Sequence, residues 1–402
     1  MKKIVSLWIV VFCIFSFYSV YAEQPDDAAI LSAEEEEAAK MLVPPQSAIV
    51  MEKESGRILY EINPRQKLPM ASTTKIMTAI VALEKGNPAD NVTISAAAEG
   101  VEGSSMYIRQ GEIMSLEELL YGLMLCSGND AAVAIAEHVG GNIEQFVQMM
   151  NQKAQEIGAL DTHFDNPNGL PSDSHYSTAY DMALITAYGL KNATFAKIVS
   201  TREMTISGYG KQYVRQLVNH NKLLKMYPDC IGVKTGFTKE AGRCLVSAAK
   251  RDEMTLICVT LNAPNDWDNH MSFYDECFQK FHLQTIEIPK DQDTTFSIKG
   301  GAVRESTAVL SHQTAFPITE GETIDTKVEF QKDIQAPIMA GTVVGKLKIL
   351  VNGSESGWME LISNEEIPVG NFAFENVSKT LLAEIEDVYQ FWLSLFGNKF
   401  VK

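Results

Sequence analysis

The order of strand-like and helical patterns along this chain constrains its fold more than any other feature. Two short strand-like runs, Ser47–Met51 and Arg57–Ile62, are joined by Glu54-Ser55-Gly56, a sequence that favours a tight turn. Helical patterns fill the middle of the chain, and strand-like runs return at 231–235, 244–249 and 255–261. We therefore expect an α+β fold, in which one antiparallel sheet combines strands from both sides of a long helical insert.

Local signals predict two helices inside this insert. Ser115-Leu116-Glu117-Glu118 has the spacing of a capping box, in which a serine and a glutamate bind free backbone N–H groups at a helix start. Residues 142–157 form an amphipathic pattern, and Gly158 follows at the position where glycine commonly ends a helix.

The pattern changes again after residue 282. Residues 283–374 alternate polar and apolar side chains between turn signals, which predicts a small all-β domain. Residues 377–396 then carry an apolar helical stripe formed by Leu381, Ile385, Val388, Trp392 and Leu395. This C-terminal amphipathic helix either packs on the β domain or lies in the membrane surface as an anchor, and we favour the anchor.

The N-terminus is typical of a secretory signal. Lys2 and Lys3 precede the apolar run Ile4–Tyr18, and Val20-Tyr21-Ala22 supplies residues suited to a cleavage site. We predict a signal peptide at 1–22, with an uncleaved anchor as the alternative, followed by an acidic tail or linker at 23–43. The protein would then be exported.

Charge and cysteine content exclude several functions. The formal net charge is −17, from 34 basic and 51 acidic residues, so no nucleic-acid partner is expected. The five cysteines beyond Cys13 are irregularly spaced, which predicts buried free thiols; a Cys244–Cys258 bridge across a hairpin is the alternative. The histidines are scattered and no zinc-ligand spacing occurs, so we predict neither a metal nor a cofactor.

Three short motifs indicate the chemistry: Ser72-Thr73-Thr74-Lys75, Ser127-Gly128-Asn129 and Lys234-Thr235-Gly236. A Ser-x-x-Lys or a Ser-x-Asn arises by chance about once or twice in a chain of this length, and Lys-Thr-Gly only ~0.1 times. Alone, each motif has an ordinary structural explanation, such as an N-cap serine. Their occurrence together, in this order and each beside a predicted element, favours one common site.

Ser72 and Lys75 have the spacing of a nucleophile and its base. The helix-forming run Ile76–Leu83 places Ser72 at a predicted helix N-terminus and Lys75 one turn along the same face. A lysine accepts a proton only when it is neutral. Burial and a nearby like charge, Lys234, would therefore have to lower the pKa of Lys75.

The second motif lies in a loop between two predicted helices. Ser127 is placed to pass a proton to a departing amine. Asn129 would hold Lys75 or a substrate amide, and capping of the next helix is the alternative.

The third motif ends a predicted strand. Lys234 and Thr235 offer a positive charge and a hydroxyl group to a substrate carboxylate. Gly236 lets a substrate backbone approach the strand closely.

The sequence around these motifs resembles the D-alanyl-D-alanine carboxypeptidases, low-molecular-weight penicillin-binding proteins of the S11 serine peptidase family. Sporulation-associated members are the most similar in character. The resemblance implies a β-lactamase/transpeptidase-like peptidase domain at 44–282, and the β domain and terminal helix also look like this family's C-terminal region. Further shared segments are Gly103-Ser104-Ser105-Met106, Asn166-Pro167-Asn168-Gly169-Leu170, 177–182 and Asn219-His220-Asn221.

The resemblance implies removal of the terminal D-alanine from peptidoglycan pentapeptide stems and inhibition by β-lactams. Ser72 would attack the carbonyl, Lys75 would accept its proton, and Ser127 would relay a proton to the leaving D-alanine. Backbone N–H groups of Ser72 and Phe237 would form the oxyanion hole, an arrangement often worth ~3 kcal/mol per donor.

Two further roles concern the substrate carboxylate. Thr235 would bind it, and we assign Arg243 to the same task from its charge and position. Many relatives carry histidine where this chain has Phe237, but the oxyanion role needs only the backbone N–H.

Two other functions fit parts of the pattern. A class A β-lactamase shares the three motifs but needs a glutamate to activate the deacylating water, and no glutamate occurs between Glu156 and Glu203. We therefore expect penicillin to acylate Ser72 and to leave slowly. The other alternative is a non-catalytic cell-wall-binding scaffold, against which the intact motifs argue.

Overall fold

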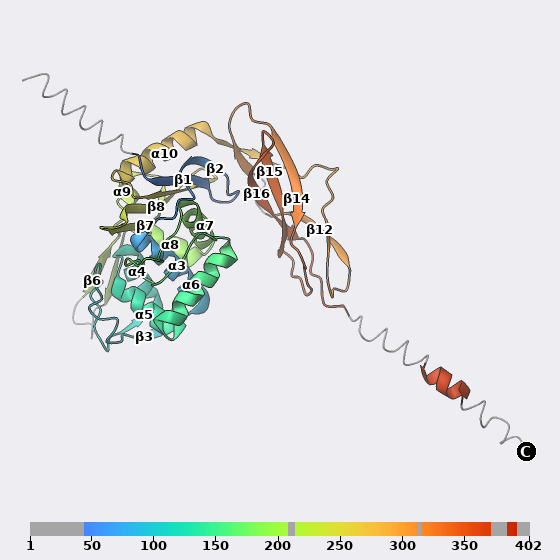
Figure 1. The fold of residues 1–402 in the computed structure, drawn as a ribbon, viewed down its shortest axis with the longest axis horizontal. Coiled ribbons are helices and arrows are strands. Elements are labelled where there is room, and N and C mark those ends of the chain that lie inside the picture. Colours follow the sequence, from blue (N-terminus) through green and yellow to red (C-terminus); the bar gives the residue numbers. More distant parts are fainter. Residues whose placement is uncertain (1–43, 208–213, 312–314, 371–383, 392–402) are drawn as a thin grey trace, which may run out of the picture.

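A five-stranded antiparallel sheet organises the first domain (Figure 1). The computed structural model describes residues 44–207, 214–311, 315–370 and 384–391. The strand order is β2-β1-β9-β8-β7. The bounds are β1 Ser47–Glu52, β2 Ile58–Ile62, β7 Cys230–Thr238, β8 Gly242–Arg251 and β9 Met254–Leu261. Strands from both sides of the helical insert therefore share one sheet, as the sequence predicts.

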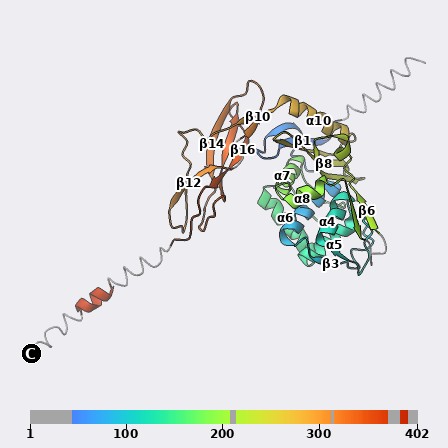
Figure 2. The same ribbon diagram turned by 180° about the vertical axis from the view of Figure 1, so that it is seen from behind.

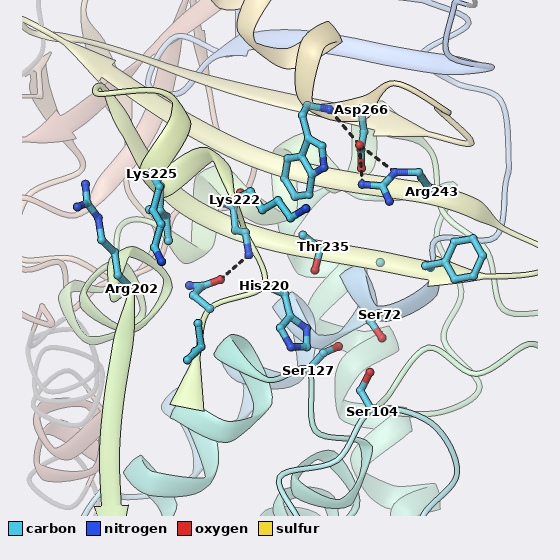
Figure 3. Close-up of a pocket in the computed structure, with 17 residues that line it drawn as sticks. Ser72, Ser104, Ser127, Arg202, His220, Lys222, Lys225, Thr235, Arg243 and Asp266 are labelled. Atoms are coloured by element: carbon cyan, nitrogen blue, oxygen red, sulfur yellow. Dashed lines mark hydrogen bonds and ion pairs between the residues drawn. The ribbon is translucent and has the colours of Figure 1, made fainter. Parts of the chain in front are cut away.

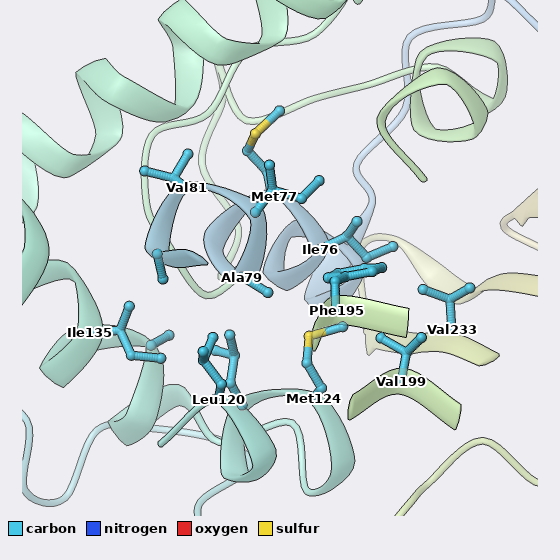
Figure 4. Packing of buried hydrophobic residues seen from close by; sticks show 14 of the residues in the cluster. Ile76, Met77, Ala79, Val81, Leu120, Met124, Ile135, Phe195, Val199 and Val233 are labelled. Atoms are coloured by element: carbon cyan, nitrogen blue, oxygen red, sulfur yellow. The ribbon is translucent and has the colours of Figure 1, made fainter. Parts of the chain in front are cut away.

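Helices cover both faces of this sheet. One face packs on α10 and the short α9, and its core includes Val50, Leu245 and Phe273. The other face packs on the helical insert, whose buried side chains meet β7 at Val233 (Figure 4). The bounds are η1 Ala71–Thr74, α3 Lys75–Lys85, α4 Leu116–Leu125, α5 Asn129–Gly140, α6 Ile143–Ile157, α7 Ala179–Gly189, α8 Ala193–Ser200, α9 Leu223–Met226 and α10 Asp266–Lys280.

Helix α3 lies at the centre of the insert. Its residues from Lys75 to Ala82 are all buried, and α4, α5 and α8 surround it (Figure 4). This burial explains why the sequence of α3 is apolar on every side. Two short antiparallel strand pairs lie within the insert. They are formed by β3 Asn91–Thr93 with β4 Ile113–Ser115, and by β5 Glu203–Ser207 with β6 Val214–Val218.

Both predicted helix signals are confirmed. Ser115 caps α4, because its hydroxyl accepts from Glu118 N and the Glu118 carboxylate accepts from Ser115 N at 2.9 Å. Helix α6 ends at Gly158, whose φ of 90° lies in the left-handed region that favours glycine.

The cysteines of the described residues are free thiols. The alternative of a Cys244–Cys258 bridge is wrong, because Cys258 pairs with Ser247 in the β8–β9 register. Cys244 and Cys258 also belong to the cores on opposite faces of the sheet, so their side chains point apart.

The second domain is all-β. A sheet of order β11-β12-β16-β15-β14 and a β10–β13 pair enclose a separate core that includes Phe296, Phe316 and Leu347. The bounds are β10 His282–Thr285, β11 Thr295–Ser297, β12 Glu305–Leu310, β13 Ala315–Ile318, β14 Ile324–Phe330, β15 Val343–Val351 and β16 Ser354–Ser363.

The β domain docks beside the β1–β2 hairpin (Figure 2). Arg57, on this hairpin, donates to both carboxylate oxygens of Glu322, at 2.5 and 3.0 Å. Its guanidinium group lies between the rings of Phe281 and Phe316, at 5.2 and 5.3 Å from their centroids. The two side chains of the ion pair are only 6 % and 13 % exposed, so this contact is largely shielded from solvent.

Several predicted segments lie outside the described residues. These are the signal peptide at 1–22, the acidic segment at 23–43 and most of the C-terminal helix at 377–396. Within 384–391 the chain is helical, and Ile385, Val388 and Tyr389 are exposed. Among the described helices, none has the length and apolar character needed to cross a membrane.

Candidate active site

Ser72 lies in a 3₁₀ turn that leads directly into α3. It therefore stands at the N-terminal end of this helix, as the sequence predicts, and the difference is that the first turn is 3₁₀ rather than α-helical. Residues Ala71–Thr74 form a 3₁₀ turn, and α3 begins at Lys75. Ala71 has a φ of 47°, in the left-handed region that non-glycine residues rarely adopt. Side-chain hydrogen bonds hold the turn, from Thr73 Oγ1 to Met70 O at 2.7 Å and from Thr74 Oγ1 to Ala71 O at 2.8 Å.

Lys75 is completely buried beside Ser72. Its Nζ lies 3.0 Å from Ser72 Oγ, 2.7 Å from Asn129 Oδ1 and 2.5 Å from Asn168 O. Burial, together with the positive charge of Lys234, holds the pKa of Lys75 well below that of an ordinary lysine. The predicted pair of Ser72 and Lys75 is therefore in contact, in surroundings that favour the neutral amine.

Gly169 allows this contact by giving the turn room. Its φ is +89°, and a Cβ at this position would lie 2.0 Å from Ala71 O and 2.9 Å from Ser72 N. Sequence reasoning noted the segment Asn166–Leu170 but assigned it no function. This segment acts through the backbone carbonyl of Asn168, which accepts from Lys75, and through the absence of a Cβ at Gly169. Neither feature depends on a reactive side chain, so a search for functional side chains does not find it.

His175 supports the 3₁₀ turn through a hydrogen bond to Thr74, and the sequence analysis assigned this histidine no role. Its Nδ1 accepts from Asp165 N at 3.0 Å, so its Nε2–H donates to Thr74 Oγ1 at 2.8 Å. Burial lowers the pKa of His175 to about 4. The imidazole is therefore neutral at physiological pH, and Thr74 Oγ1 is left to donate to Ala71 O.

The second motif faces Ser72 from the loop between α4 and α5. Ser127 has a φ of 60°, a strained conformation of the kind that is common at functional sites. Asn129 does not cap α5, because its Oδ1 accepts from Lys75 and its Nδ2 donates to Glu102 O at 2.5 Å. Asp130 instead fixes the neighbouring loop, accepting from Ser105 Oγ at 2.6 Å.

The third motif lies within β7, not at its end. Because β7 is the edge strand of the sheet, one of its sides is open to a substrate backbone. Lys234 is 1 % exposed, and burial lowers its pKa to about 7. Gly236 approaches the nucleophile turn so closely that a Cβ would lie 3.1 Å from Ser72 N, while Phe237 is 65 % exposed.

A pocket of about 600 Å³ joins the three motifs. Ser72, Ser127 and Thr235 all face it, and Ser104 and His220 complete its wall near the serines (Figure 3). Burial lowers the pKa of His220, with a further contribution from the charge of Lys234. Sequence reasoning gave Ser104 and His220 no role, although both lie in segments shared with the family.

Arg243 lines the same pocket beside Thr235 and is held in place there. Its Nε and Nη2 donate to Asp266 Oδ1 at 2.9 and 2.8 Å, and its guanidinium lies 5.5 Å from the Trp267 ring centroid. The Asp266 side chain is 3 % exposed and that of Arg243 is 40 % exposed. Asp266 and Trp267 were not predicted. Neither residue belongs to a motif, and only the fold brings α10 to β8.

Across the described ranges, no group of three or more histidine, cysteine, aspartate or glutamate side chains is arranged to hold a metal ion. The polar groups at Ser72 are instead amine, hydroxyl, amide and backbone carbonyl groups. Such a set suits acyl transfer to a serine.

Comparison with known proteins assigns the family. The fold, with its three motifs facing one pocket, is that of the penicillin-binding serine enzymes. The family model described as D-alanyl-D-alanine carboxypeptidase, peptidase S11, matches residues 33–265, and that of the penicillin-binding protein 5 C-terminal domain matches 286–369.

Individual relatives agree with these matches. The chain is 32 % identical to the D-alanyl-D-alanine carboxypeptidase DacF of Bacillus subtilis, over 81 % of this chain and 87 % of the relative. It is 30 % identical to the crystal structure of penicillin-binding protein 5 from Haemophilus influenzae, with a TM-score of 0.63, over 81 % of this chain and 97 % of that one. A Streptomyces K15 DD-transpeptidase structure is 32 % identical, with a TM-score of 0.55, over 58 % of this chain and 98 % of that one.

The chain belongs to the S11 family of D-alanyl-D-alanine carboxypeptidases. It is a serine-type hydrolase that acts on peptidoglycan stem peptides through an acyl-enzyme and binds β-lactams, as this family does.

Proposed function

We propose that Ser72 is the nucleophile and Lys75 its general base in removal of the terminal D-alanine. The observation that carries this assignment is the set of three contacts at Lys75 Nζ. A neutral amine has two N–H groups and one lone pair. Asn129 Oδ1 and Asn168 O can only accept, so they take the two N–H groups. The lone pair is left to face Ser72 Oγ, which is the one partner with a proton to give.

Ser127 then relays a proton to the leaving amine. Its loop faces Ser72 across the pocket. The charge of Lys234 acts on Lys75, the group that first takes the proton of Ser72. Backbone N–H groups of Ser72 and Phe237 form the oxyanion hole. The close approach of Gly236 to Ser72 N supports this assignment, because it brings the two backbone segments side by side.

Thr235 and Arg243 bind the terminal carboxylate, and Gly236 leaves the edge of β7 open to the substrate backbone. Because Nε and Nη2 of Arg243 both donate to Asp266 Oδ1, the other N–H groups of the guanidinium remain for the substrate. Trp267 flanks this group, so the positively charged side chain is held at the pocket rather than in bulk solvent.

The acyl-enzyme that penicillin forms on Ser72 is hydrolysed slowly. No glutamate occurs between Glu156 and Glu203, the segment in which a class A β-lactamase carries its water-activating residue. The acyl-enzyme formed with penicillin therefore lacks the group that would hydrolyse it quickly, and the drug acts as an inhibitor.

The test is a time course of intact mass after mixing the protein with penicillin, with Ser72→Ala alongside. We expect a persistent adduct that Ser72→Ala lacks, together with D-alanine release from a pentapeptide stem by the unmodified protein. Rapid consumption of penicillin without an adduct would mean a β-lactamase. An intact drug and no adduct would mean a non-catalytic scaffold.

We also propose export and peripheral attachment to the outer face of the cytoplasmic membrane. The support is the N-terminal signal pattern, with the apolar stripe at 377–396 as an in-plane anchor. Ile385 and Val388 are exposed on the described part of this helix and so are free to meet lipid. Deleting 377–402 should move the protein from the membrane fraction to the soluble fraction; unchanged sedimentation would refute the anchor.

A further inference from the structure

The β domain exposes apolar side chains at the end where its described chain reaches Gly370. Val303, Met339 and Val369 are 46 %, 61 % and 59 % exposed, and they come from three separate loops. We call these three residues the distal patch. Among the large apolar side chains exposed in the described part of this domain, only Val309 lies elsewhere, on β12. Single exposed apolar residues are ordinary, but a group of them at one place marks a surface that meets a partner.

Backbone contacts bring the three loops of the distal patch together. The segment that carries Val369 lies between the other two loops. On one side Gly301 and Val369 form an antiparallel bridge. On the other side Ile338 and Ile367 exchange both backbone hydrogen bonds, at 2.8 and 2.9 Å. Since Met339 follows Ile338 directly, the residues of the distal patch lie on or beside neighbouring extended segments.

These loops are anchored in the core of the β domain. Ile338 and Ile367 are buried and belong to that core, together with Ile298 at the start of the first loop. Met339 is exposed although its neighbour Ile338 is buried. The exposure of the distal patch is therefore a property of an ordered surface, and not of loops that make no apolar contacts.

The distal patch lies where the chain continues toward the proposed membrane anchor. The described β domain ends at Gly370, away from the peptidase domain, which it contacts through Arg57 and Glu322 (Figure 1). Seven residue steps separate Gly370 from residue 377, and a fully extended chain covers them in at most about 25 Å. A helix at 377–396 that lies in the membrane surface would therefore hold this end of the β domain close to the same surface.

The charges around the loops do not select a partner of one sign. Lys299 forms an ion pair with Asp333, and both side chains are exposed. Arg304 and Glu305, which are adjacent and exposed, again carry opposite charges. An apolar patch with charges of both signs at its rim suits the surface of a bilayer. There, apolar side chains enter the boundary between headgroups and acyl chains, while long basic side chains reach the phosphates.

We propose that the distal patch inserts into the surface of the lipid bilayer as a second membrane contact beside the helix at 377–396. This inference rests on the proposed peripheral attachment. Because the helix holds the patch near the membrane, the second contact is intramolecular, and even shallow insertion strengthens retention. Two contacts also fix the direction in which the β domain projects from the membrane, and with it the position of the pocket at Ser72.

The first test measures the partition coefficient of the chain 23–402 on phosphatidylcholine vesicles. The patch variant carries Val303→Gln, Met339→Gln and Val369→Gln. We expect it to bind about tenfold more weakly than the unmodified chain, roughly a factor of two for each side chain, because the headgroup region buries each side chain only in part.

The matched control carries Ile113→Gln, Leu160→Gln and Val309→Gln, which removes three exposed apolar side chains outside the distal patch. Its binding should stay within about twofold of the unmodified chain. Both variants should keep the unfolding temperature and the penicillin acylation rate of the unmodified chain, which shows that both domains are folded.

The vesicle measurement separates the patch from the helix. A patch variant that binds as tightly as the unmodified chain overturns the inference. If deletion of 377–402 abolishes binding in that case, the helix anchor stands without the patch. A chain 23–402 that does not bind vesicles at all would refute both the anchor and the patch.

Hydrogen exchange then identifies what covers the distal patch. With vesicles, amides within 300–304, 337–340 and 367–370 should exchange more slowly than without them. Equal exchange in both conditions would overturn the inference. If these amides are slow without vesicles and become faster when 377–402 is deleted, the terminal helix itself covers the patch and the inference is wrong.

Discussion

Replacing Asn129 by aspartate tests whether a neutral Lys75 is the base. The substitution keeps the shape of the side chain but places a negative charge where Asn129 Oδ1 now lies, 2.7 Å from Lys75 Nζ. A nearby carboxylate stabilises the ammonium form. The pKa of Lys75, which burial and Lys234 now hold low, should therefore rise.

The size of the effect follows from the contact distance. At an effective dielectric constant of about 20, two unit charges about 4 Å apart interact by about 4 kcal/mol, equivalent to about 3 pKa units. Burying the new carboxylate offsets part of this attraction, so a rise of about 1–3 units is expected. At neutral pH the neutral fraction of Lys75, and with it the acylation rate, should fall about 10- to 1000-fold.

The assay is the second-order rate of acylation by a fluorescent penicillin from pH 5 to 9.5. For Asn129→Asp, the acid limb of the profile should move to higher pH and the rate should recover as pH rises. Asn129→Ala is the control, because it removes the same hydrogen bonds without adding a charge; its rate should fall with no alkaline shift. If both variants share the wild-type acid limb, Lys75 is not the titrating base.

Three further results are expected. Gly169→Ala should slow acylation at least 100-fold, because the new Cβ displaces the turn that carries Ser72. The control is Gly158→Ala, which has a similar φ of +90° but no atom within 4 Å of the new Cβ, so it should only reduce stability. Equal acylation rates for the two variants would refute the steric argument. Lys234→Met should raise the free energy of urea unfolding at pH 6, because the folded protein has to bury the charge of Lys234. The pKa of Lys234 is about 7 in the folded protein, below the usual 10.5, so this cost, at most about 5 kcal/mol, is fully present below pH 7 and disappears as pH rises toward 10.5. An unchanged unfolding free energy at pH 6 would contradict this linkage. Glu322→Gln should leave the buried Arg57 without its ion-pair partner, at a cost of about 3 kcal/mol in stability. Calorimetry should then resolve a separate unfolding transition of the β domain at lower temperature. A single, unchanged transition would show that this contact does not hold the two domains together.

Local sequence determined the elements and the reactive residues of this protein. Helix α6 could be bounded from Asn142 and Gly158 because a cap and a left-handed terminus need particular side chains. The strand and helix periods, and the order of strands around the insert, were enough for the α+β architecture. Ser72, Lys75 and Asn129 could be named in advance because a nucleophile, a base and an amide each require specific functional groups.

Tertiary structure alone decided how those residues work. Lys75 meets Asn129 and the carbonyl of Asn168, which are 54 and 93 residues away along the chain, and a backbone carbonyl is present at every position whatever the side chain. The low pKa of Lys75 likewise depends on burial and on Lys234, a strand residue from the far side of the insert. The partnership of Arg243 with Asp266 arises because α10 packs beside β8. The sequence already named burial and Lys234 as the causes that a low pKa of Lys75 would require, and Asn129 as a partner of that lysine. Distances, burial and backbone contacts are properties of the folded chain, so only the tertiary structure could show that these groups meet.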